Sequence, residues 1–222
     1  MSEPRPIVLT RPYRPADRQA VRDICAATCW MGEYRPELMP DDWVWAEYWT
    51  RYFTDQEPEH SWVAREGAAG RVVGYLTGTV DERRFHRYAP RALPGIAWHV
   101  IRHRLMRRAV SRRAIFSLVG ALLRDEMRLP PGVAEEYPAT CHIDLLPEAR
   151  GAGVGTRLFA EFLAAMRGAG VSGVHQQPLD INPAILALLS RFGLRKIESH
   201  PNRAYAHIHP GKVELQTWVL RL

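Results

Sequence analysis

The sequence predicts a mixed α/β fold, with a central β-sheet flanked by helices, and three observations support this fold class. Residues 139–146 alternate between apolar and polar side chains, as a half-buried strand does. Residues 154–166 repeat apolar side chains at helical spacing, directly after a glycine-rich turn. The length of 222 residues and the hydrophobic content of 46% suit one domain with its own buried core. We therefore interpret residues 1–222 as a single domain.

The first eighty residues are expected to run strand, helix, helix, strand, strand. The aliphatic run at residues 7–9 predicts the first strand, and residues 17–25 predict a helix capped by its first residue, an aspartate. A strongly aromatic second helix is expected after Pro40. Two strands around a glycine turn are predicted at residues 62–66 and 72–76.

Residues 81–136 read as a basic helical insertion. Apolar residues at helical spacing predict one helix from Ile96 to Val110 and another from Ile115 to Leu123. Pro90 and Pro94 are expected to lie before the first of these helices. The segment has too few turns to form a sheet of its own.

The C-terminal part predicts three further elements after the alternating strand and its helix. Residues 171–175 form a short apolar run typical of a strand. Asn182 and Pro183 open a helix that Gly193 ends, because proline suits the first helical position and glycine the residue after the last. Residues 213–222 predict a final strand.

The net charge of +6 is unevenly distributed, and 28 of the 30 basic residues are arginine. Residues 81–128 hold 12 arginines and 4 acids, a local charge of +8 that leaves −2 for the rest. Such a block could face phosphates, an acidic protein or an anionic membrane. The simpler interpretation is a solvated helical face, or one that the partner in a homodimer covers. Nucleic-acid binding is not expected, because aromatic residues are sparse between these arginines and no nucleic-acid motif is present.

Cysteine usage and the N-terminal composition indicate a cytoplasmic protein. Cys25, Cys29 and Cys141 are odd in number and have no metal-ligand spacing, so we expect packed, reduced thiols and no metal site. No signal-peptide pattern opens the chain, and no segment reaches the ~20 apolar residues of a membrane span. No membrane partner is expected.

The segment from Arg150 to Thr156 joins the alternating strand to the start of a helix. Its glycines let the backbone approach an anion closely, and the free N–H groups of the first helical turn attract one. A dinucleotide-binding loop is disfavoured, because the last glycine comes one residue early and too little chain follows. A Walker A loop would need a lysine that is absent. The segment therefore predicts a diphosphate site, with a turn shaped only by packing as the alternative.

Residues 145–155, Leu-Leu-Pro-Glu-Ala-Arg-Gly-Ala-Gly-Val-Gly, resemble the signature loop of the GNAT superfamily of N-acetyltransferases, Arg/Gln-x-x-Gly-x-Gly/Ala. The turn at residues 11–17, the strand pair at residues 62–76, and Asn182 with Gly193 are also similar to that family. Within it, residues 142–147 are similar to bacterial acetyltransferases related to the acetyltransferase-like domain of O-GlcNAcase.

The resemblance implies a GNAT-like central mixed sheet that splays apart beside the strand ending near Leu146, with acetyl-CoA in the gap. It implies direct transfer of the acetyl group to an amine acceptor, either a small molecule or a protein, without a metal. The arm of the cofactor would pair with the strand backbone, its pyrophosphate would lie on the loop amides, and an asparagine would bind the arm. The implied cofactor-binding residues are Ile143, Asp144, Leu145, Arg150, Gly151, Ala152, Gly153, Val154, Gly155, Thr156 and Asn182.

Two positions depart from the family pattern. Leu189 stands where many relatives have a tyrosine acid, and Gln177 where some have a glutamate base. We instead expect His142 and Asp144, on one strand face, to move protons, and Tyr205 to be a candidate donor. Two alternatives stay open: a hydrogen-bonded strand-face pair without a catalytic role, and a catalytically inactive module that binds acyl-CoA.

An aromatic cluster lies in the region that forms the acceptor wall in this superfamily. Aromatic rings with carboxylates suit a cationic or sugar-like acceptor. The same spacing is also that of an ordinary core. The residues are Trp30, Tyr34, Trp43, Trp45, Tyr48 and Trp49, with Glu33 and Glu47.

Overall fold

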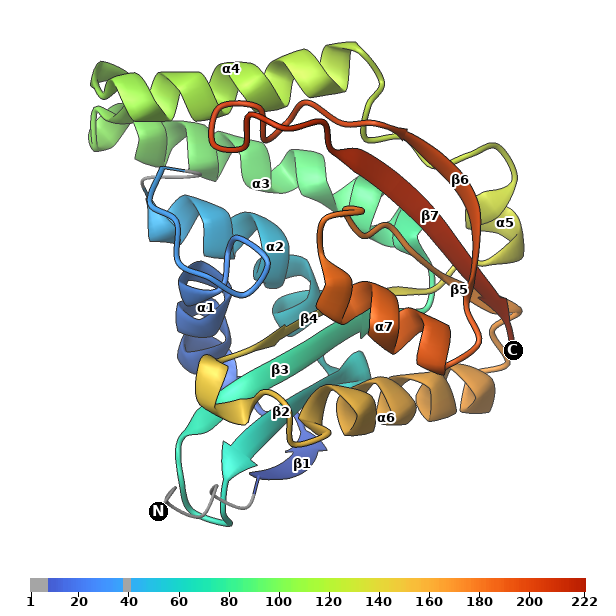
Figure 1. Cartoon of the computed structure of the whole chain (residues 1–222). Coiled ribbons are helices and arrows are strands. Elements are labelled where there is room, and N and C mark those ends of the chain that lie inside the picture. The colour runs from blue at the N-terminus through green and yellow to red at the C-terminus, as the bar shows by residue number, and fades with distance from the viewer. Residues whose placement is uncertain (1–7, 38–40) are drawn as a thin grey trace, which may run out of the picture.

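The strands form two sheets that meet at one junction in the computed structural model, which describes residues 8–37 and 41–222 (Figure 1). The first sheet is antiparallel with the order β1-β2-β3-β4, and the second has the order β5-β7-β6. A parallel bridge between Ala139 and Val174 joins them. The strands are β1 (Val8–Pro12), β2 (Ser61–Glu66), β3 (Val72–Thr79), β4 (Thr140–Leu145), β5 (Gly173–Gln176), β6 (Arg195–Pro201) and β7 (Glu214–Arg221). The α-helices are α1 (Arg18–Ala27), α2 (Asp42–Gln56), α3 (Glu82–Arg102), α4 (Ala109–Leu123), α5 (Val133–Glu136), α6 (Val154–Gly168) and α7 (Pro183–Arg191).

The predicted order of strand, helix, helix, strand, strand in the first eighty residues is confirmed. Ile7, the first residue of the predicted strand, and Pro40 lie outside the described residues. Helix α2 is capped by Asp41, whose Oδ1 accepts a hydrogen bond from the Val44 N–H at 2.9 Å. The other oxygen, Oδ2, lies 3.0 Å from Nε2 of His99. The cap therefore also ties α2 to α3.

The segment from 81 to 136 is helical as predicted, but its helix boundaries differ. Helix α3 contains Pro90 and Pro94, which the sequence placed before the helix. Both prolines are exposed, so the carbonyls that lose an N–H partner there can bind water. Val110 does not continue this helix: the chain turns at Arg104, which has a left-handed φ of 52°, and Val110 lies in α4.

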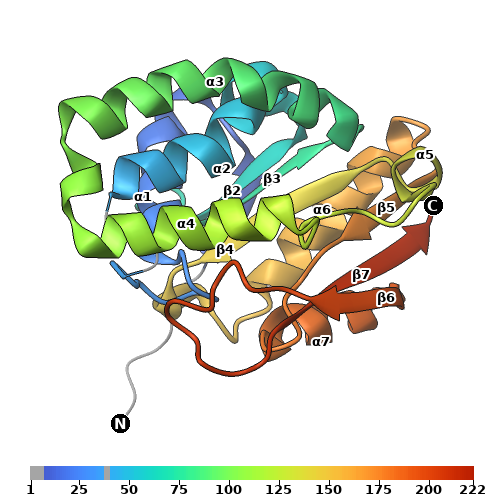
Figure 2. The ribbon, with the colours of Figure 1, turned by 90° about the horizontal axis from the view of Figure 1, so that it is seen from above.

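Helices cover both faces of the first sheet (Figure 1). On one face α6 buries Phe159 and Phe162 against Leu76, and each such side chain contributes about 1.5–3 kcal/mol of hydrophobic stabilisation. On the other face α1 and α2 pack over Val63 and Tyr75. Helices α3 and α4 lie side by side beyond α2 and form the top of the molecule (Figure 2). Among the described residues, no helix combines the length and the apolar content needed to cross a lipid bilayer.

The C-terminal elements follow the sequence pattern except for one strand. Helix α7 begins directly after Asn182 and ends before Gly193, whose φ of 79° explains the glycine there. The last strand agrees with the predicted residues 213–222 to within one residue at each end. Strand β6 has no apolar alternation and is largely exposed, and its pairing with β7 creates it. No local pattern could have predicted β6.

Candidate functional site

Strand β4 is hydrogen-bonded along one edge only. The Leu146 N–H donates to the Val73 carbonyl at 2.9 Å, and bonded pairs alternate along an antiparallel ladder. The backbones of Ile143 and Leu145 therefore face away from β3. On that side β4 meets β5 only at Ala139, where the His175 N–H donates to its carbonyl at 2.9 Å. The strands then separate, which agrees with the splayed sheet expected from the sequence.

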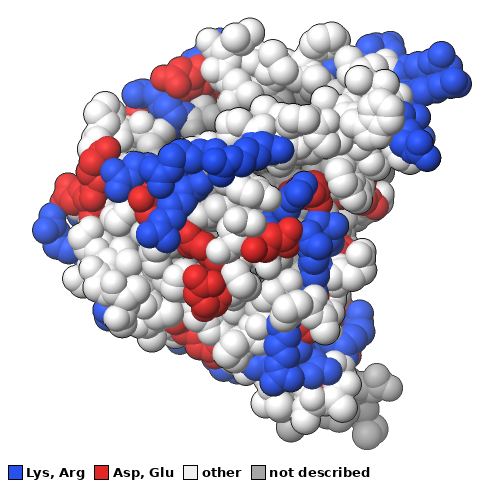
Figure 3. Space-filling view, turned by 180° about the vertical axis from the view of Figure 1, so that it is seen from behind, with Lys and Arg blue, Asp and Glu red and all other residues white. Residues whose placement is uncertain are grey.

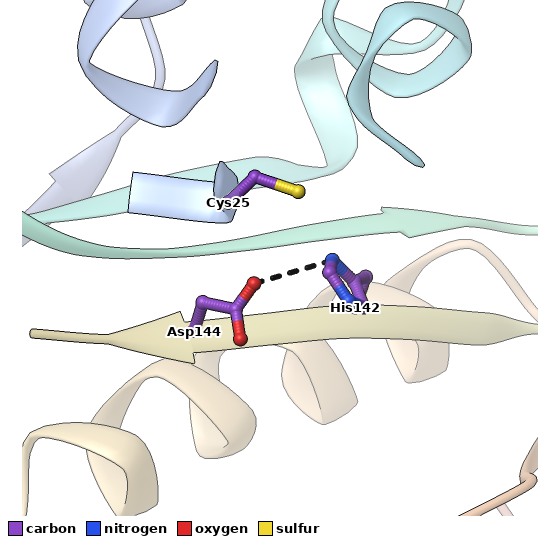
Figure 4. A group of neighbouring side chains, drawn as sticks. All are labelled: Cys25, His142 and Asp144. Carbon is purple, nitrogen blue, oxygen red and sulfur yellow. Dashed lines mark ion pairs between the residues drawn. The ribbon is translucent and has the colours of Figure 1, made fainter. Parts of the chain in front are cut away.

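Asp144 differs from its neighbours on this strand. Asp144 and Tyr75 form one of the hydrogen-bonded residue pairs between β4 and β3. The backbone of Asp144 therefore faces β3 rather than the open edge. Its side chain, together with that of His142, lies on the sheet face covered by α1 and α2 (Figure 4). Of the three residues expected to pair with the cofactor arm, Ile143 and Leu145 thus have the required backbone direction.

The loop after β4 presents backbone N–H groups that the protein does not use. Gly151 and Gly153 both have a φ of 73°, a conformation that favours glycine. Among the described residues, the first N–H after Arg150 to bond a protein carbonyl is that of Arg157, which donates to Gly153 at 3.0 Å. A Cβ on Gly153 would meet nothing within 4 Å. The unused N–H groups, the open space and the positive end of α6 form a cradle that fits a diphosphate.

Arg150 holds this loop in place through its side chain. Its Nε and Nη2 donate to the Leu145 carbonyl at 2.9 and 2.8 Å, and Nη2 also donates to the carbonyl of Gly32. The guanidinium therefore connects the end of β4 to the segment between α1 and α2. A contact of Arg150 with the cofactor would involve other atoms than these bonded donors.

Asn182, Leu189 and Gln177, all in or before the helix that follows β5, have structural roles in the protein. Asn182 caps α7, because its side-chain oxygen accepts from the Ile185 N–H at 3.4 Å. Leu189 is completely buried and belongs to the core cluster that contains Phe159. A leucine at this position packs against α6 and contributes no proton donor. Gln177 donates to the Arg128 carbonyl at 2.8 Å, so its amide has a structural partner.

His142 and Asp144 converge on a residue that the sequence analysis did not single out. The Tyr75 hydroxyl donates to Oδ2 of Asp144 at 2.6 Å and lies 3.0 Å from Nδ1 of His142. Burial raises the pKa of Asp144 against the opposing effects of His142 and Tyr75, and burial also raises the pKa of Tyr75 well above its usual range. His142 remains about one third exposed. The cluster thus combines a buried carboxyl group, a buried phenol and an accessible imidazole.

Cys25 is the fourth member of this cluster. Its sulfur and the ligand atoms of His142 and Asp144 lie within 4.8 Å of one another, a combination that could hold zinc (Figure 4). The Tyr75 hydroxyl already bonds the two β4 side chains, which accounts for their convergence. Burial raises the pKa of the Cys25 thiol, opposite to the change that a metal thiolate requires. The absence of a metal site stays a prediction.

Trp49 contacts the His142 imidazole, and further aromatic side chains form contacts with Trp49 and with one another. Trp49 stacks on this imidazole with ring centroids 5.3 Å apart and an interplanar angle of 14°. Tyr48 packs edge-on against Trp49 at 5.2 Å. Tyr205 lies 5.2 Å from Trp30, and burial raises its pKa to about 12, with a further contribution from Tyr48. These rings come from α2, the segment after α1 and the loop before β7, and they are brought together only by the fold.

The carboxylates expected in this wall lie elsewhere. Glu47 is buried and forms ion pairs with Arg22 and, at 2.8 Å, with Arg51, so it does not face the aromatic group. Its assignment to the acceptor wall is wrong, because a buried glutamate needs these cationic partners. Glu33 is exposed and lies 3.8 Å from Arg35. Asp144 lies beside the aromatic group through its neighbour His142, on which Trp49 stacks.

The sequence did not identify Tyr75 as part of the site, and it did not identify Trp49 as the stacking partner of His142. Tyr75 lies in a strand that the sequence did predict, but only the register of β3 against β4 places it opposite Asp144. A tyrosine in an otherwise apolar strand was the available signal, because a buried phenol usually has a hydrogen-bond partner.

Comparisons with known proteins agree with this geometry. Residues 27–194 match the model of the acetyltransferase (GNAT) family. The crystal structure of SsHAT is similar over 97% of this chain and 98% of its own, with 31% identity and a TM-score of 0.70. The polyamine N-acetyltransferase of Drosophila melanogaster, which forms N-acetylagmatine, aligns over 97% of this chain and 100% of its own, with 17% identity and a TM-score of 0.56. The yncA structure from Salmonella typhimurium, solved with its cofactor acetyl-CoA, aligns over 97% of this chain and 94% of its own, with 14% identity and a TM-score of 0.56.

Proposed function

Because this chain belongs to the acetyltransferase (GNAT) family, whose members use acetyl-CoA, we propose that it transfers an acetyl group from acetyl-CoA to the amine of a small molecule or protein. The observation that carries this proposal is the open edge of β4, which leads at one end into the glycine loop and lies beside the His142–Tyr75–Asp144 cluster. One edge can thus bring together the cofactor and the proton-transfer groups.

The chain fits the cofactor in two places. The outward backbone of Ile143 and the outward N–H of Leu145, whose carbonyl is bonded by Arg150, offer a strand edge to an extended amide-containing arm. The N–H groups from Gly151 to Thr156 offer donors to its diphosphate. When bound, acetyl-CoA supplies an activated acetyl thioester. An N–H on the open edge would stabilise negative charge that develops on the acetyl oxygen.

Hydrogen-bond directions suggest which atom of the cluster acts as the base. The Tyr75 hydroxyl has one proton, which it donates to Asp144. The 3.0 Å contact with His142 is then a bond from Nδ1–H to the phenol oxygen. In this tautomer Nε2 of His142 keeps its lone pair and can accept a proton from an ammonium acceptor. Asp144, acting through Tyr75, would stabilise the resulting imidazolium.

The same imidazolium is a better proton donor to the departing thiolate than Tyr205. A thiol has a pKa near 8.5, and a phenol whose pKa burial raises to about 12 gives up its proton to a thiolate unfavourably. An imidazolium is a stronger acid than a thiol, so proton transfer from it to the thiolate is favourable. His142 can therefore serve first as base and then as acid, and no tyrosine at position 189 is needed. Tyr205 is instead proposed to line the acceptor site with Trp30.

The second candidate is a catalytically inactive module that binds acyl-CoA, which Leu189 and Gln177 favour. Calorimetric titration with acetyl-CoA, combined with a thiol-release assay over a panel of amines, separates the two functions. Transfer that is lost in His142→Ala, with the affinity for acetyl-CoA unchanged, would support the enzyme. His86→Ala, on the exposed surface of α3, is the matched control. Binding without transfer to any amine would support the inactive module, and no binding would overturn both.

A further inference from the structure

Helices α3 and α4 expose large apolar side chains on the outer surface of the molecule. Leu123 is 83% exposed, Ile101 68%, Trp98 64% and Phe116 63%. Soluble proteins rarely leave several such residues on adjoining helices uncovered. We call this surface the hairpin face, and define it by Leu93, Trp98, Ile101, Met106, Phe116, Val119, Leu122 and Leu123.

Helical geometry places these residues together. On α3, Leu93, Ala97 and Ile101 recur every four residues, and all three are exposed together with Trp98. This stripe lies on the side of α3 opposite to the buried Phe85 and Ala92. Figure 2 shows α3 and α4 next to each other at the top of the molecule, so their exposed stripes can contribute to one platform.

The second part of the platform lies on α4. Phe116, Val119 and Leu123 follow helical spacing and are exposed, whereas Ala114 and Ala121 on the opposite side are buried. The small buried residues pack α4 onto the molecule, and the large apolar residues face outward. This is the reverse of the arrangement that core packing alone requires.

Basic residues outnumber acidic ones around this platform, although Asp125 is exposed at its end. No acidic residue lies between Glu82 and Asp125, and this stretch holds 11 arginines. In the part of the chain that the structure describes, Arg102, Arg104, Arg107 and Arg113 form no ion pair with a carboxylate. Figure 3 shows basic side chains gathered over the upper part of the back face, with uncharged atoms along the top. The partner of this face must therefore be anionic as well as apolar.

We propose that the hairpin face binds the surface of an anionic lipid bilayer. Exposed tryptophan, phenylalanine and leucine side chains enter the boundary between headgroups and acyl chains, while surrounding arginines bind the phosphates. A second copy is a poorer partner, because a symmetric interface would oppose two acid-free segments of 11 arginines. Nucleic acid would leave the leucine, isoleucine and valine side chains uncovered. This association is peripheral and requires no membrane-spanning helix.

Sedimentation of the full chain with vesicles tests the proposal. We expect the protein to sediment with vesicles of phosphatidylcholine and phosphatidylglycerol, to remain in solution with phosphatidylcholine alone, and to be released by salt. The variant Arg102→Gln/Arg113→Gln should bind about 25-fold more weakly, or about fivefold for each arginine. Trp98→Ser/Leu123→Ser should bind more than ~tenfold more weakly.

The matched controls change the same residue types elsewhere. Arg167→Gln/Arg191→Gln removes two arginines from α6 and α7, and Ile197→Ser removes an exposed apolar residue from β6. Both should bind vesicles like the unchanged protein. Equal binding to neutral vesicles, no binding to anionic ones, or equal losses in the controls would overturn the proposal. So would a dimer in light scattering that Trp98→Ser/Leu123→Ser converts to a monomer, because a second copy would then cover the face.

Discussion

The Tyr75 hydroxyl donates a 2.6 Å hydrogen bond to Oδ2 of Asp144, joining two adjacent strands on the face that α1 and α2 cover. Tyr75 is completely buried, so this bond fixes the orientation of a carboxyl group whose side chain is 14% exposed. The same oxygen of Tyr75 lies 3.0 Å from Nδ1 of His142. The phenol therefore bridges the carboxyl group of Asp144 and the proposed base, His142, whose Nδ1 also lies 3.7 Å from the same carboxylate oxygen (Figure 4).

Replacing Tyr75 by phenylalanine should impair turnover more than cofactor binding. The change keeps the buried ring but removes the hydroxyl that hydrogen-bonds both His142 and Asp144, and leaves only their direct 3.7 Å contact. We expect kcat to fall by roughly 10²-fold, within the usual contribution of acid–base catalysis, with little change in the Kd for acetyl-CoA. Steady-state thiol release and calorimetry measure the two effects. An unchanged kcat would remove Tyr75 from the proton-transfer mechanism.

Asp144→Asn should make the protein more stable near neutral pH while lowering its activity. Burial raises the pKa of Asp144, so the folded state favours the neutral form. The stabilisation from this group is present below its unfolded pKa of 3.8 and is lost as pH rises through the folded value. An asparagine keeps an acceptor for Tyr75 without the buried charge, so its melting temperature should exceed that of the unchanged protein at pH 7, with a smaller difference near pH 4. A lower melting temperature at pH 7 would contradict this account.

The sequence predicted those parts of the fold that local patterns determine. The alternation of β4, the glycine loop and the apolar stripe of α6 each depend on neighbouring residues, and all are found as predicted. Strand β6 and Tyr75 depend instead on register between distant strands, which no local pattern contains. The exposed prolines of α3 show a second limit, because solvent can replace a hydrogen bond that helix rules treat as lost.

The candidate site likewise contains residues that local spacing predicts and residues that only tertiary packing brings together. His142 and Asp144 share a face because strand residues two apart always do, so the sequence could place them together. Trp49 comes from a distant element, and only tertiary packing brings it onto His142. Glu47 was placed in the acceptor wall because the family resemblance assigns this region to it, whereas its arginine partners could not be found from spacing.

Gly153→Val should weaken acetyl-CoA binding by more than ~tenfold. A side chain there would occupy open space beside the unused N–H groups and would strain a backbone with a φ of 73°. Gly132→Val is the matched control, because Gly132 has a φ of 82° and equally open surroundings but precedes α5. Both variants should lose a similar amount of stability, measured by urea unfolding. If calorimetry finds that only stability changes in Gly153→Val, the loop is not the diphosphate site.

Glu82→Gln should destabilise the protein in a way that depends on pH. Oε2 of Glu82 lies 3.1 Å from Nε2 of the buried His175. Burial opposes the charge of Glu82, but the interactions with His175 and His86 outweigh it and lower its pKa to about 2. The stabilisation is therefore present above the unfolded value of 4.5 and is lost as pH falls towards 2. Urea unfolding should show a loss of about 1.5–3 kcal/mol at pH 7 and a clearly smaller loss at pH 3. A pH-independent difference would show that the carboxylate charge does not contribute.

Leu189→Tyr tests whether this chain needs the tyrosine acid that the family resemblance implies at this position of α7. Leu189 is completely buried against α6, so a tyrosine must either overpack the core or expose its hydroxyl by moving the helix. Overpacking costs about 1–3 kcal/mol, which urea unfolding would detect, and the misplaced phenol should not raise kcat. Leu189→Met, which nearly conserves volume, is the control and should cost less than ~1.5 kcal/mol. A kcat that rises in Leu189→Tyr but not in Leu189→Met would show that thiolate protonation limits the reaction, and that His142 does not supply the proton.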